Sequence, residues 1–119
     1  MIYQITLRMA WNEAQQLGEY RAKSLETEGF IHCSTNSQVL PVVEKFYKEQ
    51  RSLILLVIDP ALLASDLKWE PPSDGGPPPG VREGDLFPHV YGPINIDAVV
   101  KAVDLESNPD GRYDLPIDL

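Results

Sequence analysis

The sequence has one cysteine, few basic residues and no long apolar run, and each shortage excludes a class of protein. A single cysteine cannot form an internal disulfide, so a disulfide-stapled secreted scaffold is excluded and a reducing compartment is favoured. The longest apolar run, residues 53–58, is far too short to span a bilayer, so no membrane partner is expected. The first residues, MIYQIT, lack the basic and apolar regions of a signal peptide. We therefore expect a cytoplasmic protein.

Basic residues are outnumbered, with 10 Lys and Arg against 18 Asp and Glu, which gives a formal net charge of −8. Because an acidic protein repels a phosphate backbone at long range, general nucleic-acid binding is disfavoured. A local basic pocket for one small phosphorylated ligand is still compatible with this charge. The metal-binding spacings CxxC, HxxxH and HExxH are all missing, so we expect no metal ion.

The 119 residues suit one domain, which we place at residues 1–105, followed by an acidic surface tail at 106–119. Apolar periodicity predicts strands at residues 2–6, 30–33, 53–58, 67–70 and 98–105, and helices at 9–17 and from about Ser37 to residue 49. Residues 19–27 are polar and mixed, so we expect a loop with a turn near Ser24. Strands outnumber helices and both helices come early, which predicts an α+β fold with mixed, mainly antiparallel sheets.

Three local signals refine this prediction. The run at residues 53–58 is apolar at every position, which is typical of a central strand buried on both faces. Pro88 and Pro93 remove backbone donors, so residues 86–94 are expected to form only an edge strand or a few strand residues. Residues 71–85, PPSDGGPPPGVREGD, have no apolar period and predict a loop that is a candidate flap over a site.

The stretch EGFIHCST, residues 28–35, combines an imidazole, a thiol and two hydroxyl groups. On a strand, neighbouring side chains point to opposite faces, so His32 and Ser34 share one face and Cys33 takes the other. This separation disfavours both a shared metal ion and a cysteine nucleophile, and it predicts a buried Cys33. Ser34 and Thr35 precede a predicted helix, where they either meet an anion at its N-terminus or only cap it. Thr35 with Gln38 fits a capping box.

The chain has two histidines, His32 and His89, and each lies in an unusual context. His32 precedes Cys-Ser-Thr, and His89 lies between two prolines with Tyr91 nearby. A pocket that holds both imidazoles is suited to acid–base chemistry near neutral pH. The alternative is that each is a hydrogen-bonded structural histidine at the end of a strand.

The motifs EGFIHCST and FPHVYGPI together resemble the bacterial family called domain of unknown function 952. More distantly, the chain is similar to the ADP-ribosyltransferase-like fold, which includes the RNA 2′-phosphotransferases. This likeness implies a cleft between two small antiparallel sheets that grips NAD as a substrate. It implies a first element at residues 4–6, where no histidine or arginine is present, a second at His32 and Ser34, and a third at Glu70 or His89.

From the motifs and this likeness we expect His32, Glu70 and His89 to be catalytic and four further residues to contact ligand: Thr6, Ser34, Thr35 and Tyr91. The expected function is the binding of NAD or an ADP-ribose-like nucleotide, with transfer or hydrolysis at its glycosidic carbon, where a carboxylate commonly stabilises positive charge. The alternative is a non-catalytic module that binds a small molecule or a peptide. A metal-dependent hydrolase is a third, weaker hypothesis.

Overall fold

The computed structural model describes residues 1–47, 50, 52–72, 78–82 and 84–115. The elements follow in the order β1 (Ile2–Thr6), α1 (Arg8–Leu17), β2 (Glu19–Tyr20), α2 (Lys23–Thr27), β3 (Ile31–His32), η1 (Asn36–Gln38), α3 (Val39–Phe46), β4 (Ser52–Ile58), η2 (Pro60–Leu62), β5 (Asp66–Glu70), β6 (Phe87–Tyr91), β7 (Ile94–Asn95), η3 (Ile96–Ala98) and β8 (Val99–Glu106). The strands form three antiparallel sheets, β1-β4-β8, β2-β7 and β3-β6-β5. The predicted α+β class with mainly antiparallel sheets is confirmed.

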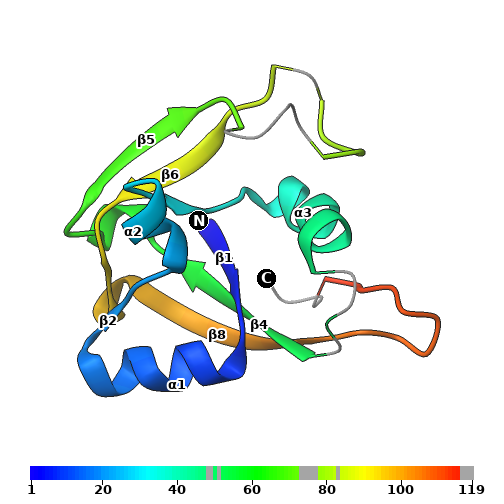
Figure 1. Ribbon diagram of the computed structural model, residues 1–119, viewed down its shortest axis with the longest axis horizontal. Helices are drawn as coiled ribbons and strands as arrows, with labels where there is room; N and C mark the ends of the chain where they lie inside the picture. Colours follow the sequence, from blue (N-terminus) through cyan, green and yellow to red (C-terminus); the bar gives the residue numbers. More distant parts are fainter. Residues whose placement is uncertain (48–49, 51, 73–77, 83, 116–119) are drawn as a thin grey trace.

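Strand β4 is the central strand that its apolar sequence predicts, because it pairs with β1 on one side and β8 on the other. Every residue of β4 after Ser52 is buried, and alternate side chains enter two different cores. One core, with Ile54 and Leu56, includes Trp11 of α1, and the other, with Leu55, includes Val43 of α3. The two helices therefore cover opposite faces of this sheet (Figure 1).

The helix boundaries follow the predicted capping signals. Gly18 ends α1 in the left-handed conformation, with φ of 86°, and its amide donates to the Ala14 carbonyl at 2.9 Å. Thr35 and Gln38 form the predicted capping box at the start of η1, which leads directly into α3. Helix α3 ends at Phe46, earlier than predicted, and residues 48–49 lie outside the described part of the chain.

Strand β6 is short, with five residues, but it is not the edge strand that the sequence offered as one alternative, since it is the central strand of β3-β6-β5. The reason is the side of β6 on which Pro88 lacks a backbone N–H donor. The Pro88 carbonyl accepts from the Cys33 amide at 3.0 Å, on the β3 side, so the missing N–H also falls on that side. Because β3 ends at His32, the ladder between β6 and β5 stays intact on the other side, with Pro88 opposite Trp69.

The prediction of a loop at residues 19–27 was also wrong in part, because this segment contains β2 and the short helix α2. Strand β2 forms because it pairs with β7, which lies far along the chain. Of the predicted loop at residues 71–85, residues 73–77 and 83 lie outside the described residues, and Pro78 is buried. Its proposed role as a flap stays a prediction.

Beyond β8, the described chain turns back onto the second core. Ser107 and Tyr113 form an isolated antiparallel bridge, and Tyr113 is buried against that core with its hydroxyl donating to the Gln50 carbonyl. The segment predicted to be a surface tail is thus anchored by one aromatic residue. In the described part of the chain, no helix is long and apolar enough to cross a membrane.

The sheets β1-β4-β8 and β3-β6-β5 are joined at the backbone between Tyr3 and Ser34. Each residue donates its amide to the carbonyl of the other, and both hydrogen bonds measure 2.8 Å. In Figure 1, β5 and β6 lie above the N-terminal end of β1, whereas β4 and β8 cross its lower part. This joint lies two residues after His32 and brings the two sheets together beside the histidine.

Candidate functional site

One face of the sheet β3-β6-β5 gathers most of the side chains that the sequence singles out. The register pairs His32 with His89 and pairs His89 with Lys68, so these three residues form a row across the three strands. Because side chains alternate along a strand, Phe87 and Tyr91 share this face with His89. The opposite face carries Ile31, Cys33 and Val90, which belong to the first core.

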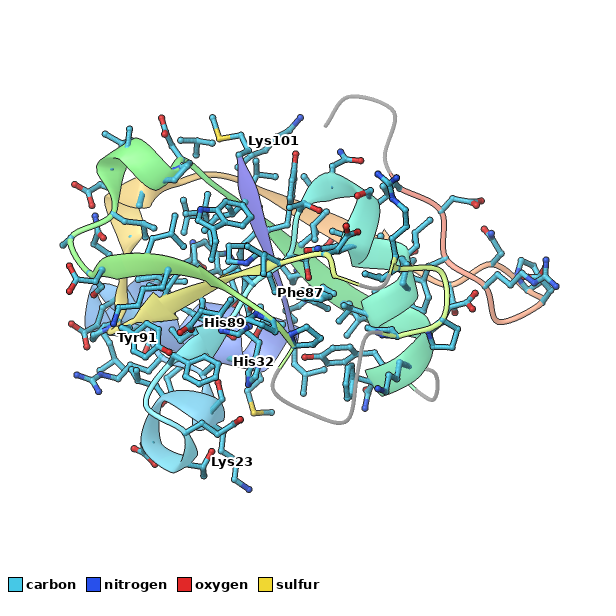
Figure 2. All side chains as sticks on the ribbon, turned by 90° about the horizontal axis from the view of Figure 1, so that it is seen from above. Lys23, His32, Phe87, His89, Tyr91 and Lys101 are labelled. Carbon is cyan, nitrogen blue, oxygen red and sulfur yellow. The ribbon has the colours of Figure 1, made fainter. Side chains whose placement is uncertain are left out.

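The two imidazoles lie edge to face, with ring centroids 5.3 Å apart (Figure 2). Phe30 stacks on His89 at 4.4 Å between centroids and lies at 4.7 Å from His32 and 5.2 Å from Tyr91. His89 is only 2% exposed, whereas the side chain of His32 is 37% exposed. The structure therefore brings both histidines together, one of them almost fully enclosed.

Glu70, on the neighbouring strand β5, joins His89 to Tyr91. Its Oε1 lies 2.9 Å from His89 Nδ1 and accepts from the Tyr91 hydroxyl at 2.6 Å. The bond from Tyr91, and after it the bond to His89, lower the pKa of the Glu70 carboxyl, because both favour its charged form. The same carboxylate raises the pKa of the Tyr91 hydroxyl. Lys68 Nζ lies 4.7 Å from the centroid of the Tyr91 ring, within cation–π range.

His32 has a carboxylate of its own. Its Nε2 lies 2.9 Å from Oε2 of Glu28, the residue that follows α2. Each histidine of the pair thus holds one ring nitrogen against a glutamate, His32 through Nε2 and His89 through Nδ1. Since these glutamates come from different segments, the two dyads are built independently.

An open cavity of about 570 Å³ lies beside the histidine pair. Its walls include residues of β1, α2, β3, α3 and β6. Four of the residues predicted to form a site line it: Thr6, His32, Ser34 and His89. Because β1 belongs to one sheet and β3 and β6 to the other, the cavity lies where these two sheets meet.

The floor of the cavity contains a buried hydrogen-bond chain from β1 to β2. The Tyr20 hydroxyl donates to Thr6 Oγ1 at 3.0 Å and accepts from Gln4 Nε2 at 3.2 Å. Burial raises the pKa of the Tyr20 hydroxyl, so it stays a neutral donor at physiological pH. Thr6 is therefore held in place and only 5% exposed.

Three cations line the same cavity: Arg21, Lys23 and Lys45. Arg21 is engaged with Glu19 at 2.5 Å between Nε and Oε2. Lys45 Nζ lies 5.2 Å from the centroid of the Phe46 ring, and in the described part of the chain Lys23 and Lys45 have no carboxylate within ion-pair distance. In a chain of net charge −8, this is a local concentration of positive charge.

The remaining predicted residues lie at the edge of this arrangement. Glu70 and Tyr91 do not line the cavity, since Glu70 contacts His89 and Tyr91 contacts Glu70, and Thr35 caps η1. Cys33 is buried, as predicted, and burial raises the pKa of its thiol to about 12. The catalytic and ligand-contacting roles of the predicted residues stay predictions.

Several residues of the site were missed in the sequence: Glu28, Phe30, Lys68, Tyr20 and the three cations. Glu28 lies four residues before His32, but that spacing signals an interaction only on a helix, and here it spans the end of α2 and β3. Lys68 joins the site through strand register, which the sequence does not give. Phe30 lies two residues before His32, so alternation along the predicted strand was a signal that could have found it. Among the described residues, no group of three or more His, Cys, Asp or Glu could hold a metal ion.

The comparisons with known proteins give a family and a fold. A sequence model of the family described as "Protein of unknown function (DUF952)" matches residues 5–102. The crystal structure of protein CC0527 from Caulobacter crescentus is 31% identical, with a TM-score of 0.80, over 96% of this chain and 93% of that chain. The solution NMR structure of CC0527 is 33% identical, with a TM-score of 0.76, over 96% and 91% of the two chains. No curated protein matches the chain.

Proposed function

The chain belongs to the DUF952 family, whose name carries no activity, and from its own side chains we propose that the cavity binds a small nucleotide such as NAD or ADP-ribose. The observation that carries this proposal is the meeting of two carboxylate-held histidines and three cations around one cavity of an acidic protein. Binding comes first in the proposal, and transfer or hydrolysis at the glycosidic carbon is its chemical step.

The size and charge of the cavity support a nucleotide. A volume of about 570 Å³ is within the range of pockets that enclose small molecules and cofactors. Arg21, Lys23 and Lys45 offer charge-assisted hydrogen bonds to a diphosphate. Tyr47, Phe46 and Phe87 add aromatic surface, on which a base or a nicotinamide ring packs.

The two-sheet architecture supports the more specific likeness to ADP-ribosyltransferase-like proteins. In that likeness, NAD is held between two antiparallel sheets, and here the cavity lies where β1-β4-β8 and β3-β6-β5 meet. His32 and Ser34 are assigned to the nicotinamide ribose. His89 is assigned to the attacking hydroxyl, and Glu70 acts through His89 because it lies behind the ring.

The binding test is a calorimetric titration of the folded protein with NAD and with ADP-ribose. We expect saturable binding of at least one of them, and about tenfold weaker binding in Lys23→Ala and Lys45→Ala, as for the loss of one charge-assisted bond. The matched control is Lys101→Ala, a cation on β8 outside the cavity, which should bind as the wild type does (Figure 2). No binding at millimolar concentrations of either ligand would reject the proposal.

The catalytic step is tested separately, by following the release of nicotinamide from bound NAD. In His89→Gln, we expect turnover to fall at least 10²-fold while the ligand still binds, because general acid–base catalysis contributes at least that much. Wild-type protein that binds NAD without consuming it would instead be a binding module, and the transferase assignment would be wrong.

A further inference from the structure

The two histidines of the site use opposite ring nitrogens for their glutamates. His89 offers Nδ1 to Glu70, and His32 offers Nε2 to Glu28, at 2.9 Å in both cases. An ionised carboxylate only accepts hydrogen bonds, so the nitrogen that faces it carries the proton in the neutral imidazole. The other nitrogen then carries the lone pair, which is Nε2 in His89 and Nδ1 in His32.

The geometry points to Glu70, clamped by the Tyr91 hydroxyl, as the positioning residue that fixes His89 as its Nδ1–H tautomer and gives the cavity an unprotonated Nε2. The inference rests on the proposed function, since it takes the cavity as the ligand site. Beyond the proposed function, it specifies which ring nitrogen of each histidine carries the proton. Glu28 has the corresponding positioning role for His32. His89 is then the base of the site, and its partner has the opposite tautomer.

Three contacts carry the argument. His89 lines the cavity and Glu70 does not, so the imidazole connects the carboxylate to the space where a ligand would lie. Tyr91 donates to the same Oε1 that faces His89, which orients this oxygen. Phe30 stacks on the ring of His89, which is a buried residue, so the ring cannot turn over without displacing Phe30.

The electrostatic surroundings agree with an ionised Glu70. The two hydrogen bonds lower the pKa of its carboxyl, and Lys68, whose ammonium lies over the Tyr91 ring, adds a positive charge on the same face. A further charged group, Glu28, faces His32. An acceptor-only Glu70 leaves His89 Nδ1 no choice but to donate.

The test is long-range ¹H–¹⁵N NMR of the ligand-free protein with ¹⁵N-labelled histidine, at about pH 8.5, where free imidazole is neutral. We expect His89 to be the Nδ1–H tautomer and His32 the Nε2–H tautomer, so that the two residues give opposite patterns. A wild-type His89 protonated on Nε2 would overturn the inference without any variant.

Variants then separate positioning from a general loss of charge. Glu70→Ala removes the acceptor, so His89 should lose its single tautomer while His32 keeps its own, and Glu28→Ala should do the reverse. The matched control is Asp66→Ala, at the other end of β5 on the same face, which should change neither pattern. An unchanged His89 pattern in a folded Glu70→Ala protein would overturn the inference.

These spectra need no ligand, so they fail independently of the nucleotide titration. If the tautomers are opposite but no nucleotide binds, the proposed function is rejected, and the inference that Glu70 and Glu28 set the tautomers of the two histidines stands. Nucleotide binding with both histidines as Nε2–H tautomers would keep the proposed function and reject the positioning role of Glu70. If NAD is consumed, Glu70→Ala should lower kcat about 10²-fold or more with little change in KM, because the wrong tautomer of His89 weakens only the reacting state.

Discussion

His32 and His89 are direct cross-strand partners, and their rings meet edge to face with centroids 5.3 Å apart. They lie 57 positions apart in the sequence, and only the pairing of β3 with β6 brings them together. Each has a glutamate on its own side, Glu28 or Glu70. The histidine pair therefore forms only because β3 and β6 pair in this register. Its chemistry depends on the residues that maintain this pairing and on those that position the two carboxylates.

The Glu70 carboxylate should stabilise the fold in a pH-dependent way. Because its pKa is lowered from 4.5 in the folded protein, its contribution is fully present above pH 4.5 and is lost as the pH falls through the folded pKa. We expect the difference in unfolding free energy between the wild type and Glu70→Gln to shrink from pH 7 to pH 3, measured by urea denaturation. A difference that grows towards low pH would contradict this.

Cys33 should be unreactive in the native protein. Its thiol is 1% exposed and its pKa is raised to about 12, so the thiolate needed for attack is scarce at pH 8. We expect a thiol-specific colorimetric reagent to label the folded chain at least 10²-fold more slowly than the chain in guanidinium, where one thiol per molecule should react. Rapid labelling of the native protein would show that the first core opens near β3.

Thr35 should prove to be a capping residue. It takes part in the capping box with Gln38 and does not line the cavity, although the sequence suggested it as a ligand contact. Thr35→Ala should cost about 1 kcal/mol of stability, as lost N-caps do, and should leave the affinity for any cavity ligand unchanged. Ser34→Ala, two residues after His32 and in the cavity wall, is the comparison that should weaken binding.

Gly92 should not tolerate a side chain. It has φ of +156°, and a Cβ there would lie 2.3 Å from Ser65 Oγ and 2.9 Å from Ser65 Cβ. We expect Gly92→Ala to cost about 2 kcal/mol or more in thermal unfolding, since overpacking adds to backbone strain. Gly111→Ala, with φ of +85° and open space around it, is the control and should show only the strain, about 1–2 kcal/mol.

Tyr113 should contribute to the stability of the whole domain. Its ring is buried in the second core and its hydroxyl donates to the Gln50 carbonyl. Tyr113→Ala should cost roughly 3 kcal/mol, as other large-to-small changes in a core do, and Tyr113→Phe about 1 kcal/mol for the hydrogen bond alone. If Tyr113→Ala unfolds like the wild type in urea, burial of Tyr113 contributes nothing to the stability of the domain, and the surface tail predicted from the sequence remains the better description.

The sequence predicted what depends on local patterns. The buried run became the central strand β4, Gly18 ended α1, and alternation along β3 placed Cys33 in the core and His32 on the other face. The predictions were wrong where an element forms by pairing with a strand that is distant in the sequence. Strand β2 forms only because β7 pairs with it, and Pro88 is accommodated in a central strand only because β3 is short.

The same limit applies to the site. The motifs singled out both histidines and Glu70 because their residue types and contexts are unusual, and the fold places His89 in contact with both His32 and Glu70. Glu28, Phe30 and Lys68 have ordinary contexts in the sequence, and each joins the site through a turn or a strand register. Tyr91, which was expected to contact ligand, does not line the cavity and donates its hydroxyl to Glu70, and its role stays a prediction.

The backbone joint between Tyr3 and Ser34 has a mechanical consequence. Two backbone hydrogen bonds fix the sheets to each other at this point, two residues from His32. The first core packs the same sheets together, because it contains Ile2 of β1 and Ile31 of β3. A change that displaces β1 should therefore also displace β3 and alter the geometry of the histidine pair.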